Sequence, residues 1–335
     1  MPPAIPGVTL TQLAYAVAVD THRHFGAAAA ASGVTQPTLS MQLRKLEHAL
    51  GAPLFDRART PVVPTEAGRR LLVQARAVLR EAEALAAAAE SPVGADEVTG
   101  ELRLGVIPTL APYLLPPAVP LLRRRHPGLA LVVEERLTDD LLDAVRRGAL
   151  DAGLVASEVH DPALAARVLF HEPFVGYVGA GHRLAPRPAL AARNLLLDDV
   201  WLLGDGHCLR TQAVQLCRQR GGRAASGVRF ESGNLETLER LVEQGEGMTL
   251  LPALAAATLR TEEQRALLRP FTAPAPGREV RLVQHRERAR RERLVAATLD
   301  VLLAPVPALL AAGVPSGDEG RNLSTRRDES TMPAR

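Results

Sequence analysis

Two cysteines and the side chains beside them are the residues of this 335-residue chain most suited to chemistry. His207 precedes Cys208, and Arg210 follows two residues later. Residues 204–217 predict a loop and then a helix, with Asp205 or a neighbour as the cap and Cys208 in the first turn. The positive end of a helix and adjacent basic side chains lower a thiol's pKa. They favour the thiolate, which is the form that peroxide oxidises.

The second cysteine, Cys217, stands nine residues after Cys208. The predicted helix runs to about Arg220 and stops at Gly221 and Gly222. Nine helical residues separate two α-carbons by about 13 Å and point the side chains to opposite sides. Because a disulfide needs α-carbons within about 7 Å, the two cysteines can bond only if this helix unwinds. The pair is therefore either a two-state switch or, in a reducing compartment, two buried inert thiols.

The length of the chain allows two or three folded units, and its hydrophobic fraction of 47% is enough for buried cores. The formal net charge of +3 is too small to indicate a nucleic-acid partner by itself. No basic segment followed by an apolar one opens the chain, and no run of about 18 uncharged apolar residues occurs. We therefore expect a cytoplasmic protein that does not span a membrane. The histidines are scattered without metal-ligand spacing, so we expect no metal and no cofactor.

The N-terminal segment predicts two short helices. Thr9 and Gln12 form a capping-box pattern in front of an apolar repeat, which indicates the start of the first helix. An alanine-rich second helix over residues 25–32 ends at Gly33, a typical C-terminal signal.

A third helix follows almost at once. Thr35 is a suitable N-cap, Pro37 fits the first turn, and Gly51 marks the end. One apolar stripe runs along it at helical spacing, formed by Leu39, Leu43, Leu46 and Leu50. Two helices joined by the short turn at residues 33–34 are typical of a helix-turn-helix.

The side of the third helix opposite the leucines is polar. The first residues of a recognition helix reach base edges in the major groove, and Gln can bond adenine through two hydrogen bonds. Residues 1–80 contain nine Lys or Arg and four Asp or Glu, which favours a DNA-binding surface over a merely solvated face. The candidate base and phosphate contacts on this helix are Thr35, Gln36, Pro37, Thr38, Ser40, Met41, Gln42, Arg44 and Lys45, with Arg57 and Arg59 as phosphate contacts.

Residues 60–64 predict the wing of a winged helix, and residues 65–90 predict one long helix. An apolar seam repeats along that helix in steps of four and three, through Leu71, Ala75, Val78, Ala82, Leu85 and Ala89. This spacing is typical of a coiled coil and favours dimerisation, whereas the alternative is packing against the helix's own domain. Residues 91–100, rich in Pro, Gly and acid, predict a hinge.

Beyond the hinge the pattern changes to alternating strands and helices. Strands are predicted near residues 102–106, 129–133, 150–155 and 248–251, with helices near 141–148 and 235–244. Such alternation predicts a parallel α/β sheet. The expected organisation is thus an α+β chain of two parts. It comprises a DNA-binding domain over 1–64, a linker helix over 65–90, the hinge, a regulatory domain over 101–310 and a disordered tail over 311–335.

These motifs resemble those of LysR-type transcription regulators. The resemblance rests on residues 27–47 (AAAAASGVTQPTLSMQLRKLE), 50–57 (LGAPLFDR) and 64–68 (PTEAG), which occur at the family's spacing. It implies a dimer or tetramer that pairs through the linker helix. It also implies a periplasmic-binding-protein-like sensor domain of two α/β subdomains with a ligand or reactive site between them.

The segment from residue 204 to 217 is similar to the redox centre of the hydrogen-peroxide-sensing members of that family. This similarity implies that Cys208 is the peroxidatic thiol, that Cys217 is its resolving partner, and that a peroxide pocket is formed by Thr109, Thr138, His207 and Arg210. The chain departs from the pattern at Thr211, where these members usually have Asp. The resemblance also implies an arginine near the site, late in the chain. Simple alignment places this position at His285, with Arg286 adjacent.

The sequence therefore predicts a peroxide-responsive DNA-binding regulator, switched by a reversible Cys208–Cys217 disulfide, and not an enzyme. Its expected partners are double-stranded DNA, further copies of itself and hydrogen peroxide, and the interpretation allows RNA polymerase as well. The alternative is a LysR-type regulator that binds a small metabolite in the sensor cleft. A thiol peroxidase is a third hypothesis, but it would leave the DNA-binding half unexplained.

Overall fold

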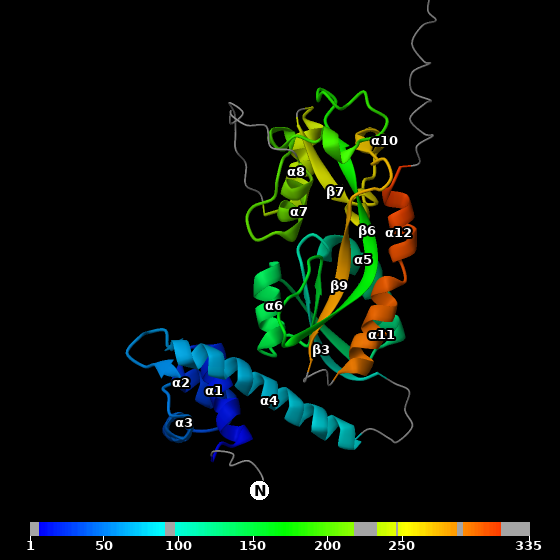
Figure 1. The fold of residues 1–335 in the computed structure, drawn as a ribbon. Helices are drawn as coiled ribbons and strands as arrows, with labels where there is room; N and C mark the ends of the chain where they lie inside the picture. Colours follow the sequence, from blue (N-terminus) through cyan, green and yellow to red (C-terminus); the bar gives the residue numbers. More distant parts are fainter. Residues whose placement is uncertain (1–6, 91–97, 218–232, 246, 287–290, 316–335) are drawn as a thin grey trace, which may run out of the picture.

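A small helical domain and a larger α/β domain are joined by one long helix in the computed structural model (Figure 1). The structure describes residues 7–90, 98–217, 233–245, 247–286 and 291–315. The expected hinge at 91–100 lies mostly outside the described residues, and so do residues 316–335 of the expected tail.

The N-terminal domain has the three predicted helices: α1 (Leu10–His22), α2 (Phe25–Ala31) and α3 (Gln36–Leu50). The capping box at Thr9 is confirmed, because both of its reciprocal hydrogen bonds with Gln12 are present. Thr35 caps α3, and Gly51 ends it in the left-handed conformation. Their core contains the predicted stripe Leu39, Leu43 and Leu46, packed against Leu13 and Val19 of α1 and against Leu72 and Ala75 of the next helix.

A short antiparallel pair, β1 (Phe55–Asp56) with β2 (Val63–Pro64), forms the wing. Helix α4 (Glu66–Glu90) follows, and its start is fixed by the Thr65 hydroxyl, which accepts a hydrogen bond from the Gly68 N–H. Gly68 lies so close to the Leu54 carbonyl that no Cβ would fit there. The wing and the beginning of the linker helix are therefore locked together.

Helix α4 divides its apolar seam between two environments. Ala75 is buried against the N-terminal domain, whereas Val78 is 46% and Leu85 74% exposed. The first half of the helix thus packs against its own domain, which is the alternative that the sequence left open. The exposed second half keeps dimerisation as a prediction.

The sensor domain is built on a seven-stranded sheet of order β4-β3-β5-β9-β6-β7, with β8 paired to β6. Strands β3 (Gly100–Val106), β4 (Leu129–Glu135) and β5 (Ala152–Val155) are parallel, as predicted, and are connected through α5 (Ala111–Arg125) and α6 (Thr138–Arg146).

The expectation of a parallel sheet is wrong for the rest of the domain. The long strand β6 (Leu164–Val178) runs antiparallel to β9 (Gly277–His285), β7 (Met248–Pro252) and β8 (Leu268–Arg269). The first part of β6 pairs with β9 and its last part with β7, so one strand passes from the first subdomain into the second. The reason is topological, because the chain must cross between the two halves and return.

Each half of the sensor domain has its own hydrophobic core. The core of the first contains Leu104, Leu141 and Leu282, and that of the second contains Phe174, Tyr177 and Leu251. The second half also holds α7 (Cys208–Leu216), α8 (Leu235–Glu243), α9 (Ala253–Ala256), α10 (Glu262–Ala266) and two short 3-10 turns, Ala192–Asn194 and Leu197–Asp199. This agrees with the expected sensor domain of two α/β subdomains.

The regulatory domain extends beyond the predicted limit at residue 310. After α11 (Glu292–Leu303), α12 (Val306–Gly313) continues to Gly313, which lies against the Ala253 carbonyl too closely for a Cβ. Among the described residues, the stretch Glu292–Gly313 has the length and composition of a membrane span. The sequence predicted no membrane-spanning segment. Its residues Val295, Leu299, Val301, Leu302 and Val306 belong to the core of the first subdomain, so part of the stretch packs inside this domain.

The buried carboxylate of Glu239 in α8 generates a pH-dependent stability. Its Oε1 has no hydrogen-bond partner, and burial, with the nearby charge of Glu236, raises its pKa to about 7. The unfolded chain ionises near pH 4.5, so the folded state holds its proton more tightly between these values. The free energy of unfolding should therefore fall as the pH rises from about 4.5 through about 7, by at most about 3 kcal/mol.

We expect Glu239→Gln to remove this loss and to stabilise the protein at pH 8, measured by urea unfolding at several pH values. Glu158→Gln, at an exposed site, is the matched control and should leave the profile unchanged. Identical profiles for Glu239→Gln and the wild-type protein would contradict the assignment.

Candidate redox site and DNA-binding surface

Helix α7 presents the first cysteine at its start. Cys208 is the first residue of the helix, and the N-cap His207 makes no side-chain capping bond. Of the two predicted possibilities, Asp205 or a neighbour, the N-cap residue is the neighbour His207, and the Asp205 carboxylate instead accepts from the Arg210 Nε at 2.9 Å. The prediction that the helix continues to Arg220 is wrong, since the backbone is already extended at Cys217. The expected stop at residues 221–222 lies outside the described residues.

The two thiols are free and lie in different hydrophobic cores. Cys208 is half-buried and packs against the core of the first subdomain, whereas Cys217 is buried in the second beside Leu184 and Leu195. Burial, and then the charge of Asp199, raise the pKa of Cys217 to about 11. In this structure Cys217 is therefore protonated at neutral pH, and α7 holds it about 13 Å of helix away from Cys208.

His207 does not carry the positive charge that the sequence argument assigned to it. Its side chain is buried, and desolvation lowers its pKa, so the imidazole is neutral at neutral pH. It can still exchange hydrogen bonds with a polar ligand. Arg210 turns toward its own loop and donates Nη1 to the Leu203 carbonyl at 2.9 Å, in addition to its pairing with Asp205.

Three segments of the candidate peroxide pocket meet at the carboxyl ends of the parallel strands. Thr109 follows β3, and Thr138 opens α6 after β4. Gly206, just before His207, lies against the Leu137 side chain, and Gln212 of α7 donates to the Ala156 carbonyl beyond β5 at 2.6 Å. Ligand sites of α/β sheets favour this edge. The structure thus brings Thr109, Thr138 and the start of α7 to one end of the sheet, with Arg210 facing the second subdomain.

The hydroxyl of Thr138 is buried and has no hydrogen-bond partner. Buried hydroxyls are normally satisfied, so an orphaned one beside the thiol helix is suited to a small polar ligand. The cavity on the second-subdomain side of α7 holds only about 10 Å³, room for about one water molecule.

A buried ion pair that the sequence analysis missed supports the pocket. Arg278 donates Nε to Glu172 at 2.8 Å, Nη1 to the Thr109 hydroxyl at 2.8 Å and Nη2 to the Thr109 carbonyl at 3.0 Å. Both charged side chains are fully buried. The other Glu172 oxygen accepts from the Leu254 N–H at 2.9 Å. Only the pairing of β6 with β9 brings these residues together, so no local sequence signal could reveal them.

The arginine that contacts Thr109 in this structure is Arg278, whereas the position to which simple alignment assigned the late arginine, His285, lies elsewhere. His285 lies opposite Leu164 at the far end of β9, and Arg286 donates to the Pro162 carbonyl. Thr211, the other departure, is exposed on α7. Among the described residues, no group of His, Cys, Asp or Glu is placed to hold a metal ion.

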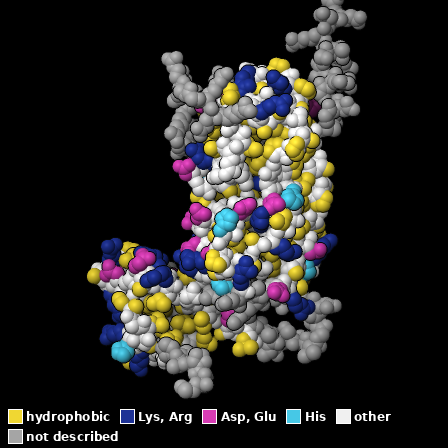
Figure 2. Space-filling view, viewed as in Figure 1, with side chains coloured by type: hydrophobic (Ala, Val, Ile, Leu, Met, Phe, Trp, Pro, Cys, Tyr) yellow, Lys and Arg dark blue, Asp and Glu magenta, His cyan; other side chains and the backbone are white. Residues whose placement is uncertain are grey.

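The predicted recognition surface of α3 is open to solvent. Thr35, Gln36, Pro37, Met41, Arg44 and Lys45 are exposed, and Thr38, Ser40 and Gln42 are half-buried between them. The Gln42 Oε1 accepts from Gln12 of α1 at 3.1 Å, which orients its amide. In Figure 2, Lys and Arg side chains lie on the outer side of this domain, where Figure 1 places α3.

The two wing arginines differ in their surroundings. Arg57 pairs with Glu47 at 2.8 Å and lies over the Phe25 ring, 5.2 Å from its centre, so it also holds the wing against α2 and α3. Arg59 is 72% exposed, with a single contact to Asp56 at 3.3 Å. Arg59 is the better placed of the two for a phosphate.

Comparison with known proteins identifies the class. Residues 10–69 match the bacterial regulatory helix-turn-helix of the lysR family, and residues 95–304 match the LysR substrate binding domain. The chain belongs to the LysR family of transcription regulators.

Particular relatives are similar over most of their length. A probable hydrogen peroxide-inducible genes activator of Streptomyces viridosporus is 40% identical over 88% of this chain and 94% of its own. The DNA-binding transcriptional dual regulator OxyR of Escherichia coli K12 is 38% identical over 82% and 89%. The full-length OxyR C199D structure from Pseudomonas aeruginosa has a TM-score of 0.71 at 32% identity, covering 88% of this chain and 98% of that one.

The buried ion pair leads to a stability prediction. Glu172→Gln leaves Arg278 charged, fully buried and without a counter-ion, so it should cost about 3–5 kcal/mol of unfolding free energy. Glu279→Gln, in the partly exposed pair with Arg281, is the matched control and should cost less than about 1 kcal/mol. Urea unfolding measures both variants, and equal losses would contradict the structural role of the buried pair.

Proposed function

We propose that this chain is a hydrogen-peroxide-sensing transcription regulator of the cytoplasm, switched by a reversible bond between Cys208 and Cys217. The observation that carries the proposal is the placement of Cys208. It opens α7 beside an orphaned Thr138 hydroxyl, at the sheet edge where Thr109 is held by Arg278. The Streptomyces relative named above is described as a probable activator of hydrogen peroxide-inducible genes, which supports the same signal for this chain.

The chemistry proceeds in two steps. The Cys208 thiolate attacks one oxygen of hydrogen peroxide, the O–O bond breaks, and the protonated leaving oxygen departs as water, giving a sulfenic acid. The Cys217 sulfur then attacks the Cys208 sulfur, loses its proton, and displaces a second water molecule. Two thiols are oxidised to one disulfide, and one peroxide is reduced to two waters.

The second step requires α7 to refold. The Cys217 thiol is protonated, buried in the other subdomain and about 13 Å from Cys208 along the helix, whereas a disulfide needs α-carbons within about 7 Å. Bond formation therefore unwinds α7, which makes the segment a two-state element.

The remaining parts of the proposal concern partners. Double-stranded DNA binds along α3 with Arg59 at the wing, and copies of the chain pair through the exposed Val78 and Leu85 of α4 into a dimer or tetramer. RNA polymerase is a further partner that the proposal allows. The chain acts as a regulator and not as an enzyme, because both of its matched domains belong to a family of transcription regulators.

The disulfide is tested by mass spectrometry of the reduced protein after a brief pulse of about one equivalent of peroxide. We expect a loss of two hydrogens, mapped to a Cys208–Cys217 link. Cys217→Ser should stop at the sulfenic acid, trapped with dimedone, and lose the oxidised DNA footprint. Two intact thiols in the wild-type protein would refute the switch and favour the metabolite-responsive alternative.

The DNA surface is tested by substitution on α3. Gln36→Ala should weaken binding by about 1–3 kcal/mol and relax the preference for one base, since its amide bonds a base edge. Arg44→Ala should weaken binding to all sequences and lower the salt slope by about one. Arg167→Ala, exposed on β6 in the sensor domain, is the control. Equal effects of Gln36→Ala on specific and random DNA would argue against base contact at this position.

A further inference from the structure

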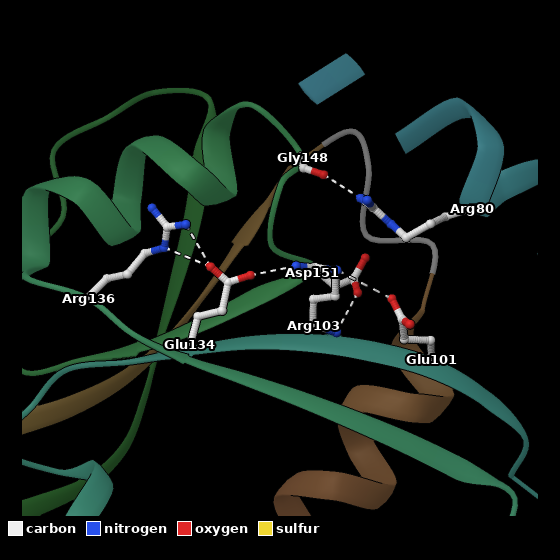
Figure 3. Close-up of polar contacts among 7 residues, drawn as sticks. All are labelled: Arg80, Glu101, Arg103, Glu134, Arg136, Gly148 and Asp151. Atoms are coloured by element: carbon white, nitrogen blue, oxygen red, sulfur yellow. Dashed lines mark hydrogen bonds and ion pairs between the residues drawn. The ribbon is translucent and has the colours of Figure 1, made fainter. Parts of the chain in front are cut away.

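The linker helix makes direct hydrogen bonds to the sensor domain at the end of α6. The Gln74 amide of α4 donates to the Arg147 carbonyl at 2.7 Å, and the Arg80 guanidinium donates to the Gly148 carbonyl at 2.6 Å. Figure 3 shows Arg80 pointing from α4 toward Gly148. These two side chains reach across from the DNA-binding half of the chain to the regulatory half.

The acceptors are suited to such a contact. The last carbonyls of a helix have no partner within the helix and carry partial negative charge, so a cation or amide donor there is favourable. Arg147 follows α6 directly, and Gly148 adopts a left-handed φ of 74°, which turns the chain after the helix. The bonds therefore bind the linker helix to the negative end of α6.

The socket around Arg80 is built from charged residues of the sheet. Asp151 accepts from the Arg103 N–H at 2.8 Å, and Arg103 pairs with Glu134 at 2.6 Å, as Figure 3 shows. Burial lowers the pKa of the half-buried Arg80, and the negative charge of Asp151 partly offsets this effect. The contact thus belongs to a polar cluster anchored in β3 and β4.

The other end of α6 lies at the candidate redox site. Thr138 is its first residue, and Leu137 before it packs against Gly206 of the loop that leads to Cys208. Between its two ends, Leu141 packs on Gly105 and Gly153, where a Cβ would collide with it. Figure 1 places α6 between α7 and α4. The nine-residue helix spans about 13 Å and is held closely enough to move as one body.

We propose that Gln74 and Arg80 form an interdomain latch through which α6 reports the state of α7 to the linker helix. The inference rests on the proposed refolding of α7. When α7 unwinds, the packing of Gly206 on Leu137 and the bond from Gln212 to Ala156 are lost. A shift of α6 by about 1–2 Å then breaks the hydrogen bonds that Gln74 and Arg80 donate to the turn after α6. Helix α4 is then free to reorient the DNA-binding domains.

The test is the double variant Gln74→Ala with Arg80→Met, which keeps the aliphatic stem of Arg80 and removes both donors. The ratio of DNA affinities between the oxidised and reduced full-length protein is compared with the wild-type ratio. We expect that ratio to fall to within about twofold of one, from a coupling typically about 5- to 150-fold. The rate of Cys208–Cys217 link formation, followed by mass, should remain within about twofold of wild type.

Two single variants sharpen the result. Arg80→Lys keeps a cationic donor and should retain part of the ratio. Arg69→Ala removes an arginine of α4 that pairs with Glu66 of the same helix, so it should keep the wild-type ratio. A double variant with the wild-type ratio would overturn the latch.

A second measurement needs no peroxide and so separates the latch from the switch. Hydrogen exchange of the α4 peptide over residues 76–86 in the reduced protein should be faster in the double variant and unchanged in Arg69→Ala. Unchanged exchange in the double variant would overturn the latch, whatever the cysteines do. If the wild-type protein forms no disulfide, the proposed function fails, and the exchange result still decides whether the contact exists.

Discussion

The buried pair between Glu172 and Arg278 is the interaction on which the sensor domain depends. Two charges removed from water must satisfy each other and find further hydrogen bonds, or the fold loses several kcal/mol. Here the remaining donors and acceptors reach Thr109 of the first subdomain and the Leu254 N–H of α9, a helix that contributes Leu254 to the first core and Ala255 to the second. The pair therefore fixes the register of β6 against β9 and holds both subdomains at the point where the candidate pocket lies.

The two cysteines lie on a short helix outside the part of the sensor domain that the Glu172–Arg278 pair holds in place. Helix α7 is only nine residues long and touches both subdomains, with Cys208 in one core and Cys217 in another. The structure thus separates the part that must stay fixed, around Thr109, from the part that must move.

Signal transfer then requires an element that touches both the mobile helix and the DNA-binding half. Helix α6 meets this requirement, because its first turn adjoins the loop before Cys208 and the two carbonyls that directly follow its last residue accept bonds from α4. The same α4 buries Leu72 and Ala75 in the DNA-binding core and leaves Leu85 exposed for a second copy. One helix therefore connects the recognition surface, the sensor domain and the expected dimer.

Local patterns in the sequence determined most of the N-terminal half and the identity of the cysteine pair. Caps such as Thr9 and Thr35, the leucine stripe of α3 and the strand alternation around Leu104 depend on neighbours within a few residues, so they can be recognised without the fold. Tertiary structure alone decided the antiparallel return through β6 and β9, the early end of α7 at Cys217, and the neutral state of buried His207. It also decided that Arg278 supports Thr109, since strand register and burial depend on contacts between residues more than a hundred positions apart.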